Sequence, residues 1–277
     1  MKSPAMTSPA MTRIGRLFLS LKRENRKGLI AFLTAGDPSP LRTPALVAAM
    51  VRGGADLIEL GVPFSDPVAD GPVIQRSGER ALKAGTTMAT VLEMARQIRA
   101  TSEVPLLLFT YLNPVLRYGL ERLARDAAAA GIDGCLLTDA SVEEAETYVG
   151  AMHRNGLDTV FLAAPTSTPR RIKLVAQYST GFVYLVSRTG VTGVQDSLAA
   201  SVTPLVQAVR AVTDLPLAVG FGISQPAHVA ELGRQVEAVV VGSAFVRLIG
   251  QHADNPALET LLEAFTRELK SGFGAAA

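Results

Sequence analysis

Short apolar runs alternate with amphipathic stretches along most of this 277-residue chain. Parallel strands that are covered by helices read as near-continuous apolar runs, because neither face of the sheet meets water. The pattern therefore predicts eight buried parallel strands. They are expected at Leu29–Leu33, Leu57–Leu60, Pro105–Phe109, Cys135–Leu137, Thr159–Ala163, Val183–Val186, Leu217–Val219 and Ala238–Val241.

Between these runs the apolar residues recur at helical spacing. Near the N-terminus, Ile14, Leu17, Phe18 and Leu21 form one stripe at positions i, i+3, i+4 and i+7. The spacing of Ser141–Glu144 is typical of a capping box at a helix start. Further helices are expected at Pro44–Val51, Thr90–Ile98, Leu120–Ala130, Glu143–Met152, Arg170–Gln177, Leu198–Val212, Pro226–Leu232 and Pro256–Leu269.

Eight strand–helix units over about 250 residues fit a closed (β/α)8 TIM barrel of the α/β class. The alternative, a doubly wound open sheet, usually carries a Gly-rich GxGxxG turn after its first strand. Here that turn reads Thr34-Ala35-Gly36-Asp37-Pro38, which does not suit a pyrophosphate. We expect residues 1–11 to be a disordered N-terminal extension and residues 12–277 to form one barrel catalytic domain.

Composition narrows the class of protein further. Hydrophobic residues make up 48% of the chain and charged residues 19%, which is ample for a folded core. A formal charge of +2 is too small to predict a nucleic-acid surface, and no apolar run is long enough to predict a membrane span. The single cysteine excludes an intramolecular disulfide framework, and it favours a cytoplasmic protein.

In a barrel, chemistry is expected at the carboxyl ends of the strands. Glu59 lies in the second apolar run and shares a face with Leu57 and Gly61. Burial raises the pKa of a carboxyl group, and a raised pKa suits a general acid/base near neutral pH. The alternative is a structural glutamate that pairs with an arginine or accepts from an amide.

Two aspartates follow in the loop after this strand. Asp66 and Asp70 stand among three prolines in a polar segment that we expect at the catalytic end of the barrel. Either one can supply a second carboxylate opposite Glu59. The alternative is ordinary turn chemistry, since Asp-Pro and Asp-Gly pairs are common in turns.

Glycine-bearing segments follow the last three strands: Ser187–Gly193, Gly220–Ser224 and Gly242–Ala244. Glycines expose backbone N–H groups, and a helix N-terminus adds a favourable dipole, so such loops bind anions. Any one of these glycines can be a simple turn. Three adjacent loops of this kind favour a phosphate site.

The positions of lysine and histidine argue against two other chemistries. None of the six lysines lies in a strand run or at its carboxyl end, where a Schiff-base lysine is needed. His153, His228 and His252 fall in helical or post-helical stretches, so no catalytic metal is expected. Cys135 is expected to be a core thiol. Carboxylate acid/base chemistry on a phosphorylated substrate remains.

The segments that carry these candidates resemble the tryptophan synthase alpha chain family. The longest match is Glu59-Leu60-Gly61-Val62-Pro63-Phe64-Ser65-Asp66-Pro67, continued by Ala69-Asp70-Gly71-Pro72. The likeness spans nearly all of the chain after the N-terminal extension. It includes Phe32–Pro38, Tyr111–Pro114, Tyr184–Gly193, Gly220–Ser224 and Gly242–Ala244.

The resemblance implies a carbon–carbon lyase of tryptophan biosynthesis, which cleaves indole-3-glycerol phosphate to indole and D-glyceraldehyde 3-phosphate in a retro-aldol reaction. It implies that Glu59 protonates C3 of the indole ring and assists removal of the glycerol hydroxyl proton. Asp70 would accept a hydrogen bond from the indole nitrogen, and Tyr184 would be an active-site tyrosine.

The resemblance also implies two groups of substrate-binding residues. The phosphate would be held by Gly193, Gly222, Gly242 and Ser243. The indole ring would be lined by Phe32, Ile74, Phe109, Thr192 and Phe221, and the alternative for each apolar one is ordinary barrel core.

The family pairs with a beta chain in an alpha2beta2 heterotetramer, and that beta chain uses pyridoxal phosphate to condense indole with serine. The resemblance therefore implies no cofactor in this chain, and contact with a beta chain through the loop that holds Pro63 and Asp66. One segment departs from the family pattern. Thr138-Asp139-Ala140-Ser141 stands where the family usually has Asp, an aliphatic residue and Pro.

Three other functions are compatible with parts of this pattern. One is a stand-alone indole-3-glycerol-phosphate lyase that releases free indole without a beta partner. Another is a phosphate-binding barrel isomerase, which would turn over substrate without cleaving a carbon–carbon bond. The third is a degenerate chain that only activates a beta chain, which the presence of both Glu59 and Asp70 disfavours.

Overall fold

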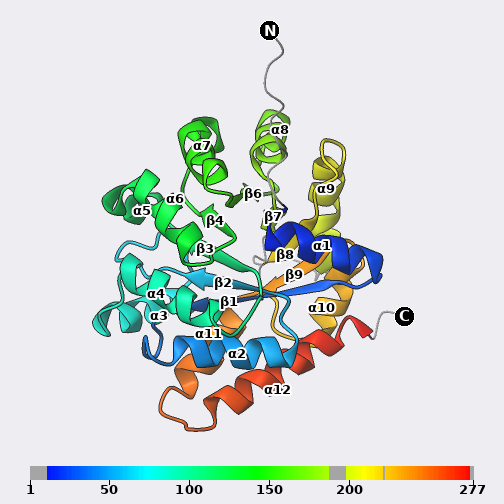
Figure 1. The fold of residues 1–277 in the computed structure, drawn as a ribbon. Helices are drawn as coiled ribbons and strands as arrows, with labels where there is room; N and C mark the ends of the chain where they lie inside the picture. The colour runs from blue at the N-terminus through cyan, green and yellow to red at the C-terminus, as the bar shows by residue number, and fades with distance from the viewer. Residues whose placement is uncertain (1–10, 187–197, 221, 275–277) are drawn as a thin grey trace.

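The computed structural model describes residues 11–186, 198–220 and 222–274. In that part of the chain a central parallel sheet is surrounded by helices (Figure 1). The strands are β1 (Gly28–Thr34), β2 (Leu57–Gly61), β3 (Leu106–Thr110), β4 (Gly134–Leu137), β5 (Asp158–Val160), β6 (Leu162–Ala163), β7 (Val183–Val186), β8 (Leu217–Gly220) and β9 (Ala238–Val241).

Most of the helices lie outside the sheet between consecutive strands, whereas one precedes the first strand and two follow the last. They are α1 (Arg13–Arg23), α2 (Thr43–Gly53), α3 (Pro72–Lys83), α4 (Met88–Arg99), α5 (Leu112–Tyr118), α6 (Leu120–Ala129), the 3-10 turn η1 (Val142–Glu144), α7 (Glu146–Arg154), α8 (Pro169–Tyr178), α9 (Leu198–Arg210), α10 (Pro226–Gly233), α11 (Ser243–Gln251) and α12 (Leu258–Ser271). None of the helices in the described part of the chain combines the length and apolar character needed to cross a bilayer.

The sheet closes into the predicted barrel. Its strand order is β5-β4-β3-β2-β1-β9-β8-β7-β6, and its two end strands are separated in sequence only by Phe161. The backbone N–H of Thr180 donates to the carbonyl of Thr159, and that of Tyr184 donates to the carbonyl of Phe161. β5 and β6 are therefore two halves of one barrel strand, and the eightfold fold class is confirmed.

The division of the fifth strand differs from the single predicted run. The N–H of Phe161 donates to the Ser179 side-chain hydroxyl at 3.2 Å, so a side chain takes the place of a strand neighbour there. β5 then pairs with β4, and β6 pairs with β7. The pairing partner of this barrel strand thus changes from β4 to β7 at Phe161.

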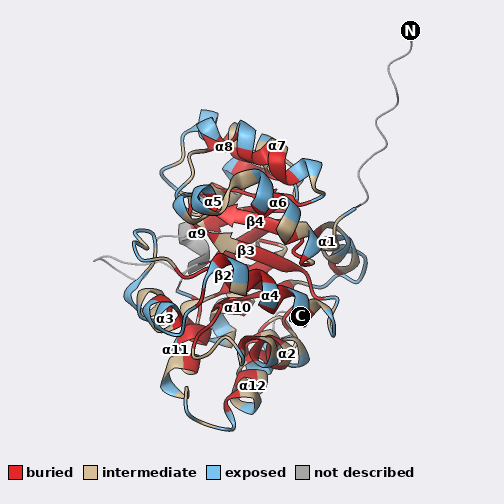
Figure 2. Ribbon diagram, turned by 60° about the vertical axis from the view of Figure 1, so that its left-hand side comes forward, coloured by how far each residue is buried: buried red, intermediate tan, exposed pale blue. Residues whose placement is uncertain are grey.

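Alternation along the strands separates two apolar clusters. Ile30, Leu57, Leu107 and Leu136 point into the barrel, whereas their immediate neighbours along each strand pack against the surrounding helices. Figure 2 shows the strands buried along nearly their whole length, while the helices are exposed on their outer faces. Side chains at the same phase as Leu57 therefore lie inside the barrel.

Helix α1 covers one end of the barrel. Its predicted apolar stripe is confirmed, because Ile14, Phe18 and Leu21 are buried in the interior cluster. The rings of Phe18 and Phe182 lie 5.6 Å apart, and the hydroxyl of Thr12 caps the helix by accepting from the N–H of Gly15. Burying one large apolar side chain contributes roughly 1.5–3 kcal/mol, so the stripe attaches α1 firmly.

The predicted capping box at Ser141 is wrong. The Ser141 hydroxyl donates to the Glu143 carboxylate at 2.6 Å, so it is not engaged as a helix cap. The segment forms only the short turn η1, and α7 begins at Glu146 after an uncapped Ala145.

The sequence pattern missed helices α3, α5 and α11. Helix α3 begins at Pro72, directly after the proline-rich segment that was expected to be loop. Proline is well suited to the first helical position, because its missing N–H would have no partner there in any case. Helix α11 begins at Ser243, within a glycine-bearing segment that was expected to be a phosphate-binding loop.

Candidate active site

Glu59 lies inside the barrel, as its alternation with Leu57 predicts. It is in the middle of β2, in register with Phe32 of β1 and Leu107 of β3. Only 1% of the residue is exposed. A carboxyl group is thus buried near the carboxyl end of the barrel, where barrel enzymes carry out their chemistry.

The surroundings of this carboxyl group favour its protonated form. Oε1 of Glu59 is buried and has no hydrogen-bond partner among the described residues, and it is the one buried carboxyl oxygen in that condition there. Burial raises the pKa of Glu59 from 4.5 to about 8, because the charged form is poorly solvated. At neutral pH the group can donate a proton and take one back. The structural alternative was a glutamate paired with an arginine. Among the described residues, Glu59 forms no ion pair.

Tyr184 approaches Glu59 from β7, across the barrel. Burial, and then the negative charge of Glu59, raises the pKa of the Tyr184 hydroxyl well above its usual value, so the phenol keeps its proton. The hydroxyl lies against Gly220 of β8, where a Cβ atom would come within 2.3 Å of it. Only glycine at position 220 leaves room for the tyrosine.

Asp70 is held by Tyr111 at the mouth of the barrel. The Tyr111 hydroxyl donates to Oδ2 of Asp70 at 2.9 Å and accepts from the N–H of Ala69 at 3.1 Å. The Gln75 side-chain amide donates to the Asp70 carbonyl at 2.9 Å. Burial raises the pKa of Asp70, and the Tyr111 hydrogen bond partly opposes that rise. Hydrogen bonds thus fix both the side chain and the backbone of Asp70.

Three of the residues expected at the indole ring line one cleft together with Asp70. They are Phe32, Ile74 and Phe109, and we call this space the Asp70 cleft. The rings of Phe32 and Phe109 meet edge to face at 5.2 Å. A Cβ atom at position 61 would lie 2.5 Å from the Phe32 ring, so Gly61 makes room for it. The cleft is therefore walled by aromatic rings beside a carboxylate.

The described residues of two glycine-bearing segments, those after β8 and β9, lie at the carboxyl end of the barrel. Gly222 follows β8 with φ +67°, a conformation that favours glycine. Gly242 directly precedes α11, Ser243 is its first residue, and no side chain caps that helix. Its first N–H groups and dipole suit an anion. Three other expected residues, Thr192, Gly193 and Phe221, lie outside the residues that the structure describes.

The loop expected to contact a partner divides into two parts. Pro63 is buried and lines the Asp70 cleft, whereas Asp66 is exposed and accepts from its neighbour Ser65. Val68 is 83% exposed. The outer part of the loop, and not Pro63, is available at the surface.

Tyr111 is a site residue that the sequence analysis did not single out. Tyr111 directly follows β3. It continues the inward alternation of Leu107 and Phe109, so the strand periodicity could have found it. Its ring also lies 5.2 Å from that of Phe64, which belongs to the same loop as Asp70.

A single barrel, with a buried carboxyl group below its mouth and an uncapped helix N-terminus at its rim, is typical of an enzyme of the (β/α)8-barrel class. Comparisons with known proteins identify the family. The model of the family described as tryptophan synthase alpha chain matches residues 18–273. This chain therefore belongs to the tryptophan synthase alpha chain family.

Curated relatives and solved structures agree with this assignment. The chain is 82% identical to the tryptophan synthase alpha chain of Solibacter usitatus over 96% of its own length and 100% of the relative's. It is 51% identical to that of Geobacter sulfurreducens, over 86% of this chain and 90% of the relative. The crystal structure of the alpha subunit from Legionella pneumophila str. Paris has a TM-score of 0.86 at 35% identity, covering 96% of this chain and 100% of that one.

The family defines the activity. The chain is a lyase that cleaves indole-3-glycerol phosphate to indole and glyceraldehyde 3-phosphate, as the alpha subunit in tryptophan biosynthesis. The comparisons do not support the stand-alone lyase or the barrel isomerase.

Proposed function

We propose that Glu59 is the acid/base of this cleavage. The observation that carries the proposal is the unpartnered Oε1 of a fully buried carboxyl group with a pKa of about 8. A group protonated at neutral pH donates its proton to C3 of the indole ring. The resulting carboxylate then takes the proton of the glycerol hydroxyl, so the enzyme ends the cycle as it began.

The electrons move as follows in this proposal. Protonation at C3 leaves a cationic ring whose nitrogen draws the electrons of the bond between C3 and the glycerol carbon. That bond breaks as the hydroxyl on the same carbon loses its proton, which yields the aldehyde and neutral indole. One general acid/base of this kind contributes about 100- to 10,000-fold to the rate.

Asp70 stabilises the positive charge by accepting a hydrogen bond from the indole N–H. Support comes from Tyr111, which occupies Oδ2 and leaves the other carboxylate oxygen without a protein donor among the described residues. Hydrogen bonds to a charged acceptor are stronger than neutral ones. Tyr184 keeps its proton beside Glu59 and orients the reacting groups as a hydrogen-bond donor.

The substrate phosphate binds at Gly193, Gly222, Gly242 and Ser243 in this proposal. The free N-terminus of α11 supports the last two. The indole ring binds among Phe32, Ile74, Phe109, Thr192 and Phe221, and the aromatic wall of the Asp70 cleft supports the first three.

The partner is a tryptophan synthase beta chain in an alpha2beta2 tetramer. Contact is made through the exposed part of the loop around Asp66, and pyridoxal phosphate belongs to that beta chain, so this chain uses no cofactor of its own. A cytoplasmic location agrees with the single cysteine. The 1–11 segment is proposed to be an extension outside the catalytic domain of residues 12–277.

Turnover of indole-3-glycerol phosphate by Glu59→Gln tests the central role. The amide keeps the size of the side chain and cannot exchange the proton, so we expect a loss of at least about a thousandfold in kcat. Steady-state release of indole measures it. A variant that retains a tenth of the wild-type activity would refute the proposed role.

A further inference from the structure

A second cavity opens at the mouth of the barrel, on the side away from the Asp70 cleft. Its volume is about 220 Å³, far above the roughly 10–15 Å³ that one water molecule needs. It lies at the carboxyl ends of β4, β6 and β7, between the loop that follows β4 and the first turn of α8. None of the proposed catalytic or phosphate-binding residues lines it.

The inner end of the second cavity is apolar and adjoins the catalytic residues. Leu162 lines it from the barrel interior, whereas Phe161 and Val142 of η1 line it from the layer between the strands and the helices. Leu162 is in register with Tyr184, and it packs in the same interior cluster as that tyrosine. Leu162 thus lines the second cavity and also neighbours Tyr184.

The outer end is polar and open. Thr166 and Arg171 line it and are exposed. The wall between the two ends is fixed by hydrogen bonds: the N–H of Ser167 donates to the Ala164 carbonyl at 2.8 Å, and the N–H of Ala164 donates to the Ser167 hydroxyl at 3.0 Å. The loop after β4 is held as well, because Asp139 accepts from the N–H of Leu112 at 2.7 Å.

The orientation of the substrate directs part of the indole ring toward this cavity. Asp70 and Tyr111 hold N1 on the β2–β3 side, and Gly222 and Gly242 hold the phosphate beside β8 and β9. The β4–β7 sector of the barrel mouth is then left for the benzo edge of the ring. C5 and C6 are the ring carbons farthest from both N1 and C3, so they point outward into that sector.

We propose that the second cavity receives substituents at C5 and C6 of the indole ring, and that the enzyme therefore cleaves indole-3-glycerol phosphates carrying small apolar groups there. This inference rests on the proposed function, since it uses the placement of N1 at Asp70 and C3 at Glu59. Ala140 sets the space available, because it lines the cavity with a single methyl group. Its loop is also the segment that departs from the family pattern.

The test compares kcat/KM for the parent substrate with that for its 5-methyl and 6-methyl derivatives. For the wild type we expect the methyl derivatives to stay within about fivefold of the parent, because a site without room for an added methyl group rejects it by roughly 10–200-fold. Ala140→Leu fills the cavity, so it is expected to lower kcat/KM for both derivatives at least tenfold and to leave the parent within about twofold.

Two controls separate this effect from damage to the fold. Ala140→Val is a smaller change that should give an intermediate loss. Ala128→Leu makes the same substitution at a half-buried alanine of α6, away from the cavity, and should leave all three substrates alike. Unchanged turnover of the parent by Ala140→Leu reports that the variant is folded.

A wild type that is about a hundredfold slower on both methyl derivatives would overturn the inference, as would an equal loss on all three substrates in Ala140→Leu. Failure of the proposed function looks different. In that case Glu59→Gln would still cleave the parent substrate, whatever the ratio between the substituted and unsubstituted compounds.

Discussion

The Glu59 carboxyl group illustrates how a single residue can serve catalysis and weaken the fold. It is fully buried, and Oε1 has no hydrogen-bond partner among the described residues. Leaving a buried polar atom unsatisfied costs roughly 1–3 kcal/mol. The same surroundings raise the pKa of the group to about 8, which is the property that the proposed chemistry needs.

Linkage between proton binding and folding makes this cost depend on pH. The unfolded chain releases the Glu59 proton near pH 4.5, whereas the folded chain keeps it until about pH 8. The unfolded state therefore binds fewer protons in this window, so Glu59 lowers the stability of the protein progressively as the pH rises from 4.5 to 8.

Glu59→Gln is consequently expected to gain stability relative to the wild type as the pH rises. Between pH 5 and pH 9 the difference in free energy of unfolding should shift in favour of the variant by several kcal/mol, with about 5 kcal/mol as the upper limit. Urea unfolding at both pH values measures it. A difference that does not change with pH would contradict the raised pKa.

At the amino ends of the strands, buried or partly buried carboxylates join neighbouring elements in the same way three times. Three carboxylates each stand just before a strand and accept an N–H at the start of the preceding strand. They are Asp56, Asp133 and Glu237, and the donors are Leu29, Leu106 and Leu217 respectively. Each carboxylate also pairs with a basic side chain. They are Lys270, Arg99 and Arg210.

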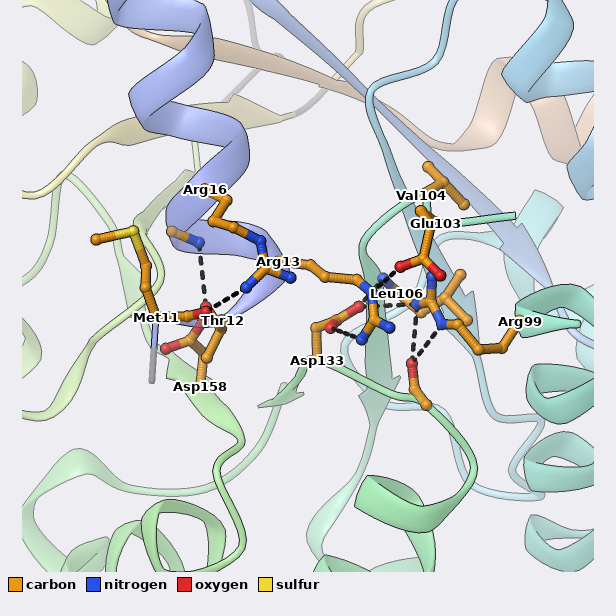
Figure 3. A network of polar contacts seen from close by, with 12 residues as sticks. Met11, Thr12, Arg13, Arg16, Arg99, Glu103, Val104, Leu106, Asp133 and Asp158 are labelled. Carbon is orange, nitrogen blue, oxygen red and sulfur yellow. Dashed lines mark hydrogen bonds and ion pairs between the residues drawn. The ribbon is translucent and has the colours of Figure 1, made fainter. Parts of the chain in front are cut away.

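Asp133 is the most buried of the three, and Figure 3 shows its surroundings. It accepts from Arg99 at 2.9 Å and from Arg13 of α1 at 3.1 Å, and only 4% of it is exposed. This carboxylate ties β3, α4 and the N-terminal helix together at the end of the barrel opposite the active site.

Asp133→Ala should therefore destabilise the protein by about 3 kcal/mol, because it leaves Arg99 and the Leu106 N–H without their partner. Glu103→Ala is the matched control: Glu103 also pairs with Arg13, but its side chain is 79% exposed, so we expect a much smaller loss than for Asp133→Ala. Equal losses in urea unfolding would show that the buried network does not stabilise the barrel.

At the scale of the whole molecule, the two ends of the barrel carry different groups, which serve stability at one end and the candidate site at the other. The amino ends of the strands carry the ion-paired carboxylates and the covering helix α1. The carboxyl ends carry Asp70, the Asp70 cleft and the second cavity. Exposed apolar residues at the carboxyl end are available to a partner, and Val68 is the most exposed one on the loop around Asp66.

Val68→Glu is expected to weaken the complex with a cognate beta chain at least tenfold, because a charge would be buried in the proposed contact. Val212→Glu makes the same change at an exposed valine that follows α9, toward the amino end of β8, and should leave the affinity unchanged. Titration calorimetry measures both. Equal affinities for the two variants would place the beta contact elsewhere on the alpha chain.

Periodicity alone determined the barrel and the direction of its key side chains. Continuous apolar runs located all eight strands, and the period of two put Glu59 inside, since neither property depends on distant residues. Helices that begin at Pro72 or Ser243 escaped because prolines and glycines also suit loops. The resemblance to the family came from the chemistry-bearing loops.

Only the tertiary structure decided which groups meet. The hydrogen bond between Tyr111 and Asp70 joins residues 41 positions apart. The contact of Tyr184 with Gly220 joins two neighbouring strands that are distant in sequence. The pKa of Glu59 likewise follows from how completely the neighbouring strands exclude water. Spacing along the chain specifies the local conformation, whereas desolvation and close approach depend on the closure of the barrel, which brings distant segments together.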